Sequence, residues 1–163
     1  MSELVEVKVS GLALDERSRS PVVLLQELGG TRVLPIWIGA PEANSIAMEL
    51  AGKKFQRPLT HDLLRTVIEG LKGTIRKILI TDLKDGTFFA RILITRDNDV
   101  IGVDARPSDS IALALRAHSP IFVSEELFQP GLEGTEADEE KKKDQIRDFL
   151  RNLPPEDFGN IAP

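Results

Sequence analysis

The sequence contains no cysteine and no tyrosine, and aromatic residues make up only 5% of its 163 positions. Without cysteine the chain has no disulfide, no catalytic thiolate, no cysteine-ligated zinc site and no iron–sulfur cluster. No stretch approaches the roughly 20 consecutive apolar residues of a membrane-spanning helix, and the first residues lack the basic and apolar regions of a signal peptide. We therefore expect a cytoplasmic protein without a membrane partner.

The net charge of −5 is unevenly distributed along the chain. Residues 1–120 contain 16 Lys and Arg against 15 Asp and Glu, whereas residues 121–163 contain 5 against 11. Residues 53–77 are locally basic, with seven Lys and Arg and only two acids. An acidic total argues against a nucleic-acid partner, but a neutral body with a basic segment is compatible with one. Nucleic acid is therefore kept as a candidate partner.

Two parts of the chain show the same succession of patterns. Three strand-like segments are followed by a helix-like segment over about residues 4–51, and again over 75–117. An offset of 65 residues aligns Ser45–Leu50 with Ser110–Leu115. A fixed period over several elements indicates an internal duplication, although two amphipathic helices can also resemble each other by chance. The pattern predicts an α+β fold built from duplicated β-β-β-α units.

Glycine and proline mark turns and strand edges within this pattern. Gly29-Gly30 separates two apolar runs and predicts a hairpin, because glycine tolerates the positive φ of tight turns. Pro35 cannot donate a ladder hydrogen bond, so its strand is expected at a sheet edge or at a bulge. In the second repeat, residues 84–86 (Lys-Asp-Gly) predict a turn between two strands.

A connecting helix is predicted between the two repeats. Thr60 is a suitable N-cap for a helix that runs to about Leu71. Apolar residues recur at helical spacing and predict a buried stripe, formed by Leu63, Leu64, Val67, Ile68 and Leu71.

The composition changes towards the C-terminus. Residues 1–128 are predicted to form one domain, and residues 129–163 an acidic linker followed by an amphipathic helix. The apolar face of that helix contains Ile146, Phe149, Leu150 and Leu153. So short a helix needs a partner, either its own domain or a second chain. Trp37 and the phenylalanine pair Phe88-Phe89 favour a homodimer, because aromatic residues are enriched at interface centres.

Several ordered blocks of the sequence resemble the bifunctional nuclease (DNase/RNase domain) family. The blocks are Leu34-Pro35-Ile36-Trp37-Ile38-Gly39 with Glu42-Ala43, Arg57-Pro58-Leu59-Thr60-His61-Asp62-Leu63, Thr87-Phe88-Phe89-Ala90, and Asp104-Ala105-Arg106-Pro107-Ser108-Asp109-Ser110-Ile111-Ala112-Leu113-Ala114. The resemblance spans about Val5 to Phe128. It implies an α+β fold around a mixed β-sheet, frequent self-association and the ability to degrade both DNA and RNA. It does not supply an agreed set of catalytic residues.

Phosphodiester hydrolysis needs an activated water, neutralised phosphate charge and a stabilised leaving group, and a divalent metal held by carboxylates commonly provides these. Asp104 at a strand end and Asp109 in the next helix are expected to converge. Glu42 occupies the related position in the first repeat. These three carboxylates are the predicted ligands for Mg²⁺ or Mn²⁺, with Asp104 and Asp109 also predicted to be catalytic.

Histidine and arginine supply the other predicted functions. His61 and Asp62 are catalytic candidates at a helix start, where His61 is suited to be a general base or a metal ligand. Arg57 and Arg106 each precede a proline and are candidates for binding phosphate through paired donors. The leading interpretation is thus a metal-assisted nuclease of low sequence specificity.

A structural interpretation accounts for many of the same residues. Asp62, Asp109 and Glu42 are residue types that stabilise the first turn of a helix. Asp104 and Arg106 are suited to an intramolecular ion pair, and a histidine beside an acid is often only a hydrogen-bonding group. The alternative functions are a noncatalytic regulatory module that binds an anion or nucleotide, and an oligomeric adaptor.

Overall fold

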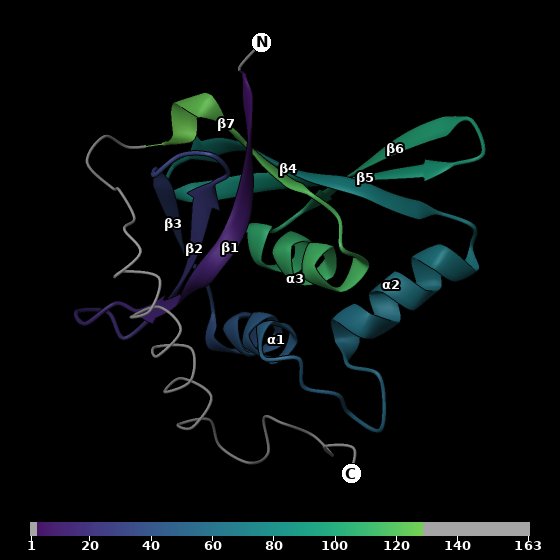
Figure 1. Cartoon of the computed structure of the whole chain (residues 1–163), viewed down its shortest axis with the longest axis horizontal. Coiled ribbons are helices and arrows are strands. Elements are labelled where there is room, and N and C mark those ends of the chain that lie inside the picture. Colours follow the sequence, from purple (N-terminus) through teal and green to yellow (C-terminus); the bar gives the residue numbers. More distant parts are fainter. Residues whose placement is uncertain (1–2, 129–163) are drawn as a thin grey trace. The chain divides into compact units, whose positions relative to one another are not determined.

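The computed structural model describes residues 3–128, which form two compact units (Figure 1). One unit contains residues 3–6 and 57–127, and the other contains residues 7–56 together with Phe128. Both contribute strands to a seven-stranded mixed sheet, so the α+β fold predicted from the sequence is confirmed. The predicted C-terminal helix lies outside the described residues.

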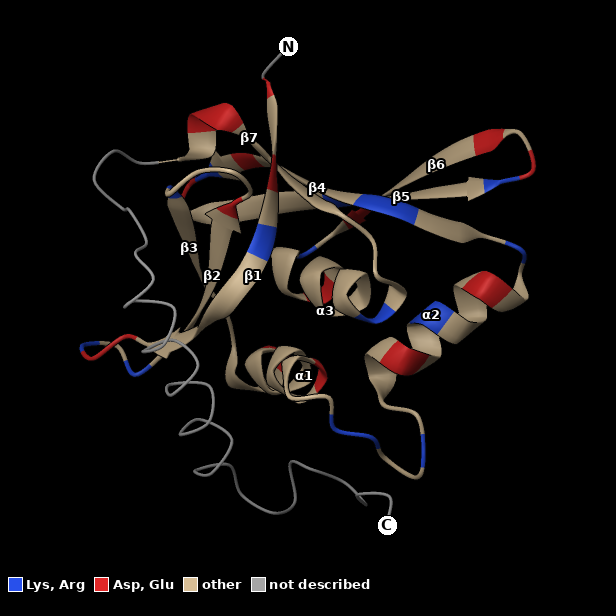
Figure 2. Cartoon of the chain, in the orientation of Figure 1, with Lys and Arg blue, Asp and Glu red and all other residues tan. Residues whose placement is uncertain are grey.

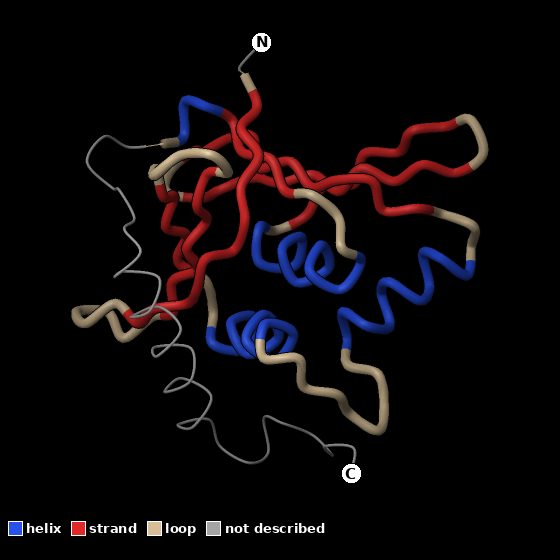
Figure 3. The backbone as a smooth tube through the Cα atoms, viewed as in Figure 1, coloured by secondary structure: helices blue, strands red, loops and turns tan. Residues whose placement is uncertain are grey.

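The first unit is a β-sheet with two helices on one of its faces (Figure 3). Its elements are α2 (Thr60–Gly70), β4 (Thr74–Lys84), β5 (Thr87–Arg96), β6 (Asp99–Ala105), α3 (Pro107–Ala117), β7 (Ile121–Ser124) and the 3-10 helix η1 (Glu125–Leu127). Strands β4, β5 and β6 form an antiparallel meander, and β7 pairs with β4 in parallel. Helix α3 packs on β4 and β5, and α2 packs on α3. The candidate site is built at the contact between these two helices.

The second unit has a similar but smaller plan. Its elements are β1 (Leu4–Leu14), β2 (Pro21–Glu27), β3 (Val33–Trp37) and α1 (Ala40–Leu50). The strands form an antiparallel meander, and α1 packs on β2. Strand β3 lies at one edge of the sheet, which confirms the edge position predicted from Pro35.

The two predicted repeats share one connectivity. Leu4–Leu50 runs through β1, β2, β3 and α1, and Thr74–Ala117 runs through β4, β5, β6 and α3. In each, three antiparallel strands follow one another in sequence order before the helix. The element order is thus as predicted, while the origin of the two halves by duplication stays a prediction.

The predicted turns lie where the backbone requires a left-handed conformation. Asp85 and Gly86 form the two-residue loop between β4 and β5, with φ of 51° and 77°. Gly29 lies in the longer β2–β3 loop with φ of 75°. Both hairpins are therefore confirmed, since positive φ at these positions matches the twist of the flanking strands.

Alternating aliphatic residues form the core of each unit. In the first unit, Ile78 and Ile80 of β4 face Ile111 and Leu113 of α3, and none of these side chains is exposed to solvent. The core of the second unit includes Leu12, Val23, Leu25 and Ile46. The apolar face of each sheet is thus paired with the apolar face of its helix.

Helix α2 differs from the sequence prediction in two respects. Its N-cap is Leu59, so Thr60 is the first helical residue and not the cap. The predicted buried stripe is largely exposed, with Leu63 at 53% and Leu71 at 62%. The helix instead turns His61 and Arg65 towards α3, because polar contacts with α3 determine its orientation.

A lone tryptophan on an apolar strand is expected either in the core or at an interface. Trp37 is 54% exposed, and its indole Nε1 donates to Asp15 Oδ2 at 2.8 Å. The core position is therefore wrong, and the interface position stays a prediction. No helix within the described part of the chain is long and apolar enough to span a membrane.

Gly73, between α2 and β4, permits a close approach that tests the packing of the first unit. A Cβ added there would lie 3.0 Å from side-chain methyl groups of Ile68 and Ile94. Gly73→Ala is expected to lower the free energy of unfolding by about 1–3 kcal/mol, because the backbone and these side chains must move apart. Urea denaturation measures the change.

Gly70→Ala provides the matched control within the same segment. No atom lies within 4 Å of a Cβ added at this last residue of α2. Alanine there should stabilise the protein by about 0.5–1 kcal/mol through its better helix propensity. Equal stability of Gly73→Ala and the unsubstituted protein would contradict the packing described for Gly73.

Candidate functional site

Each helix of the described chain carries an acid at its third position. Glu42, Asp62 and Asp109 follow the N-caps Gly39, Leu59 and Arg106 by three residues in α1, α2 and α3. A negative charge in the first turn is favourable because the first backbone N–H groups have no partners within the helix. The structural interpretation of these acids is thus supported, and the question is which of them is also placed for chemistry.

Asp62 behaves as a helix-capping residue. Its Oδ2 accepts a 2.9 Å hydrogen bond from the backbone N–H of Leu59. This is half of a capping box, since the leucine side chain has no acceptor to return the second bond. Asp62 Oδ1 accepts from Arg116 Nε at 2.8 Å. Both oxygens of this carboxylate are therefore used within the protein.

Asp109 joins α3 to α2 through its side chain. Its Oδ1 lies 2.9 Å from His61 Nε2, and its Oδ2 accepts from Arg106 Nε at 2.9 Å. His61 is buried, with a side chain only 11% exposed, whereas Arg106 is 65% exposed and Asp109 is 30% exposed. The Arg106–Asp109–His61 cluster thus leads from the surface into the contact between the helices.

The electrostatics of the cluster determine its protonation pattern. Partial burial raises the pKa of Asp109, but hydrogen bonds from Arg106 and His61 and the charges of both groups outweigh it. The pKa of Asp109 consequently lies below its ordinary value of 3.8. An ionised carboxylate only accepts hydrogen bonds, so His61 donates to Asp109 from Nε2.

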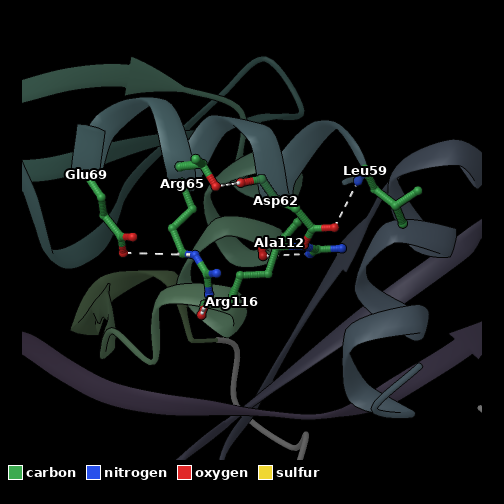
Figure 4. Close-up of polar contacts among 7 residues, drawn as sticks. Leu59, Asp62, Arg65, Glu69, Ala112 and Arg116 are labelled. Atoms are coloured by element: carbon green, nitrogen blue, oxygen red, sulfur yellow. Dashed lines mark hydrogen bonds and ion pairs between the residues drawn. The ribbon is translucent and has the colours of Figure 1, made fainter. Parts of the chain in front are cut away.

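A buried arginine holds the two helices together (Figure 4). The side chain of Arg116 is 2% exposed, and it donates to Asp62 Oδ1 and to the carbonyl oxygen of Ala112 at 2.8 Å each. Arg65 on α2 donates to the carbonyl oxygen of Arg116 at 2.7 Å and lies near Glu69. A buried guanidinium requires such partners because an unpaired charge away from water is very costly.

These contacts also lower the pKa of Asp62. Burial alone would raise it, but the hydrogen bond from the Leu59 amide and the hydrogen bond and charge of Arg116 have the greater combined effect. Asp62, predicted as catalytic, therefore supports the helix contact. The alternation of acid and base along α2 is visible in Figure 2.

The sequence analysis did not identify Arg116 as part of the site. The available signal was its position, since it is the only charged residue after Asp109 in an otherwise alanine- and leucine-rich helix. It lies four residues after Ala112 and shares that buried face. A lone arginine on an apolar helix face predicts a buried partner, which only the fold identifies as Asp62.

The remaining candidates lie in different surroundings. Asp104 is exposed on β6 in register with Arg91, and its convergence with Asp109 stays a prediction. Arg57 is exposed in the loop before α2. In the second unit, the side chain of Glu42 lies against Gly39 at the start of α1. Of the predicted site residues, the structure thus brings together His61, Asp109 and Arg106.

A metal site requires several ligands in one place. Within residues 3–128, no three His, Asp or Glu side chains are grouped so that they could hold an ion. Metal binding by Glu42, Asp104 and Asp109 therefore stays a prediction. The cluster places the guanidinium of Arg106, a group suited to binding phosphate, beside a carboxylate–imidazole pair.

Comparisons with known proteins agree with the resemblance seen in the motifs. The family model for the bifunctional nuclease domain matches residues 23–132, a range that includes all the candidate site residues. An uncharacterized protein of Mycobacterium tuberculosis (strain CDC 1551 / Oshkosh) is 43% identical over 162 residues, covering 94% of this chain and 97% of that protein.

Plant proteins are more distant relatives. Bifunctional nuclease 1 of Oryza sativa subsp. indica is 24% identical over 113 residues, or 68% of this chain and 34% of that protein. Bifunctional nuclease 2 of Arabidopsis thaliana is 24% identical over 111 residues, or 66% of this chain and 34% of that protein. The match thus spans about a third of these plant proteins.

The lowered pKa of Asp62 predicts acid sensitivity of the contact between α2 and α3. The folded pKa lies below the unfolded value of 3.8, so the stabilisation is fully present above that pH and is lost as pH falls through the folded pKa. Asp62→Asn should lower the free energy of unfolding by about 1 kcal/mol at neutral pH, and the difference should shrink in acid.

Urea denaturation between pH 7 and pH 2 measures this difference, with Asp99→Asn as the control. Asp99 is exposed at the start of β6, so its replacement by asparagine should leave stability unchanged at every pH. An Asp62→Asn deficit of the same size at neutral and acidic pH would contradict the role given to the ionised carboxylate.

Proposed function

The chain belongs to the bifunctional nuclease domain family, and on this basis we propose that it is a nuclease that hydrolyses phosphodiester bonds of DNA and RNA with low sequence specificity. The observation that carries the proposal is the Asp109 carboxylate held between His61 and Arg106. This cluster combines a positive charge with a proton-transfer pair, which are two of the requirements of phosphodiester hydrolysis.

Each member of the cluster has a distinct role in the proposed reaction. Arg106 is the most exposed of the three and neutralises the phosphate oxygens. Asp109 orients the His61 ring through Nε2, and the imidazole is proposed as the general base that takes the proton of the attacking water. Arg57, exposed in the preceding loop, is proposed as a second phosphate contact.

Dependence on Mg²⁺ or Mn²⁺ is a separate part of the proposal. The described side chains do not group as a three-ligand site, so the mechanism above contains no metal-dependent step. The assays of the proposed nuclease therefore compare the rate of hydrolysis in Mg²⁺, in Mn²⁺ and in EDTA.

The burial of His61 favours a second candidate function. At 11% side-chain exposure, the imidazole has little contact with solvent, while the Arg106 guanidinium is accessible. A noncatalytic regulatory module would use the same arginine to bind an anion or a nucleotide. The two functions differ in one property, because only the nuclease breaks a phosphodiester bond.

Nuclease assays on labelled single-stranded DNA and RNA, with Mg²⁺, Mn²⁺ or EDTA, test the proposal. Asp109→Asn retains the size of the side chain but removes its charge, and it should slow hydrolysis about 100-fold or more. Asp99→Asn should retain full activity. It is prepared in parallel as the control for contaminating nuclease. Thermal unfolding confirms that both variants are folded.

The outcomes separate the candidates. Binding of oligonucleotides without cleavage, in every metal condition, would favour the noncatalytic module. Cleavage that is equally fast in Asp109→Asn would show that this cluster is not the active site.

We also propose that the chain forms a homodimer through the exposed face of α2. Leu63, Val67 and Leu71 recur at intervals of four residues and are each about half exposed or more. An apolar stripe of this length on a monomer surface commonly marks an interface. A second copy of the same helix, related by two-fold symmetry, would cover it without leaving a free stripe.

Light scattering over a hundredfold dilution measures the mass of the particle. Val67→Asp should convert the dimer to a monomer, because a carboxylate cannot be buried without a partner. Thr66→Asp places the same charge at the adjacent exposed position and should retain the dimer. A monomer mass for the unsubstituted protein at every concentration would refute the dimer.

A further inference from the structure

The sheet of the first unit has two different faces. Alternate residues of β4 and β5, including Ile78, Ile80, Ala90 and Ile92, are buried on the face that α2 and α3 cover (Figure 1). The residues between them point to the other face. There Arg91 and Phe89 are exposed, with Phe89 at 39%, while Lys77, Leu79 and Leu93 are half-buried. We call this second side the open face.

Strand register places a row of four side chains across the open face. Phe122 of β7 is opposite Leu79 of β4, Leu79 is opposite Arg91 of β5, and Arg91 is opposite Asp104 of β6. Residues directly opposite each other on neighbouring strands point to the same side. The row therefore presents an aromatic ring, an aliphatic side chain, a guanidinium and a carboxylate side by side.

Lysines of β4 lie over the two phenylalanine rings. Lys77 Nζ is 5.4 Å from the centroid of Phe122, and Lys84 Nζ is 5.6 Å from that of Phe89. Cations at this distance are attracted by the negative face of the ring. Each ring is thus accompanied by a positive charge that is able to contact a phosphate.

The side chain of Arg91 lies next to Gly102 of β6. A Cβ added at Gly102 would be in ordinary van der Waals contact with Arg91, 3.8 Å from its Cζ. The Arg91 guanidinium therefore lies beside the backbone of β6. A guanidinium on a sheet surface is able to stack against a base as well as to bind a phosphate.

From these features we propose that the open face binds single-stranded nucleic acid. The inference rests on the proposed nuclease function and adds the class and location of its extended substrate contact. Unpaired bases stack on the Phe122 and Phe89 rings, and the neighbouring cations bind the backbone. Stacking on a ring does not contact the hydrogen-bonding edges that distinguish one base from another. This mode of binding therefore has the low sequence specificity of the proposed nuclease.

The charge of the open face favours a polyanion over a second copy of the chain. Strand alternation and the contact of Arg76 Nε with Thr95 Oγ1, at 2.8 Å, assign four cations to this face. On β4, β5 and β6 the cations of this face are Arg76, Lys77, Lys84 and Arg91, and the acids are Asp82 and Asp104. The acidic helix η1 also contacts β4. Two such surfaces would repel each other, whereas a nucleic-acid backbone is complementary to them. Basic residues of β4 form a blue segment of the ribbon in Figure 2.

Fluorescence anisotropy with a labelled 12-nucleotide single strand, in EDTA, measures binding. Arg91→Glu should weaken binding about tenfold at low salt, and the loss of one phosphate contact should reduce the salt dependence by about 0.7 in log–log slope. Arg96→Glu is the matched control, because Arg96 is exposed on the same strand and alternates to the other face. Phe122→Leu keeps an apolar side chain and should weaken binding roughly fivefold or more.

Hydrolysis of a small phosphodiester, bis(p-nitrophenyl) phosphate, separates this inference from the nuclease proposal. Arg91→Glu should retain that hydrolysis, because the small substrate does not need the open face, while Asp109→Asn should lose it and still bind the oligonucleotide. Equal oligonucleotide binding by Arg91→Glu and Arg96→Glu would overturn the inference. So would a change in particle mass on Arg91→Glu substitution, which would assign the face to a second copy.

Discussion

The buried charge of Arg116 is the constraint on which the first unit depends. A guanidinium that is 2% exposed must have its donors satisfied inside the protein, and Asp62 on α2 satisfies one of them. That pairing determines which face of α2 meets α3. It places His61, one residue before Asp62, within hydrogen-bond distance of Asp109. The packing requirement of one arginine thus assembles the candidate site.

The acids at the helix starts show how one feature of the backbone serves two purposes. Asp62 and Asp109 occupy the same position in their helices, where a negative charge is favourable. Asp62 is saturated by the Leu59 amide and by Arg116, whereas Asp109 is held by an exposed arginine and a histidine. The two carboxylates are similarly exposed, at 33% for Asp62 and 30% for Asp109, so Asp109 is distinguished by its contact with an imidazole.

The two faces of the sheet in the first unit differ in role, because one packs in the core and the other is proposed to bind nucleic acid. One face carries aliphatic side chains that pack on α3, and the open face, opposite α2 and α3, carries rings and cations. Because side chains alternate along a strand, the same strands supply both surfaces. Substitutions on the open face are therefore separable from those that affect the core, which makes the proposed nucleic-acid surface experimentally accessible.

The sequence by itself determined the features that depend on neighbouring residues. Strand alternation, the turn at Asp85-Gly86, the edge position of Pro35 and the repeated order of elements all follow from local backbone preferences and were predicted. The family was also evident, because ordered motif blocks need no knowledge of contacts. The contact of Arg106 with Asp109 is also local, since the two residues are three positions apart at a helix start.

Tertiary structure alone decided which distant residues meet. His61 and Asp109 are separated by 48 positions and Asp62 and Arg116 by 54, and a helical pattern contains no record of such pairs. The apolar stripe of α2 was predicted to be buried, yet the helix buries its polar face. The physical reason is that exposed aliphatic surface costs a modest free energy, whereas an unpaired buried guanidinium costs far more, so the ion pair set the orientation of the helix.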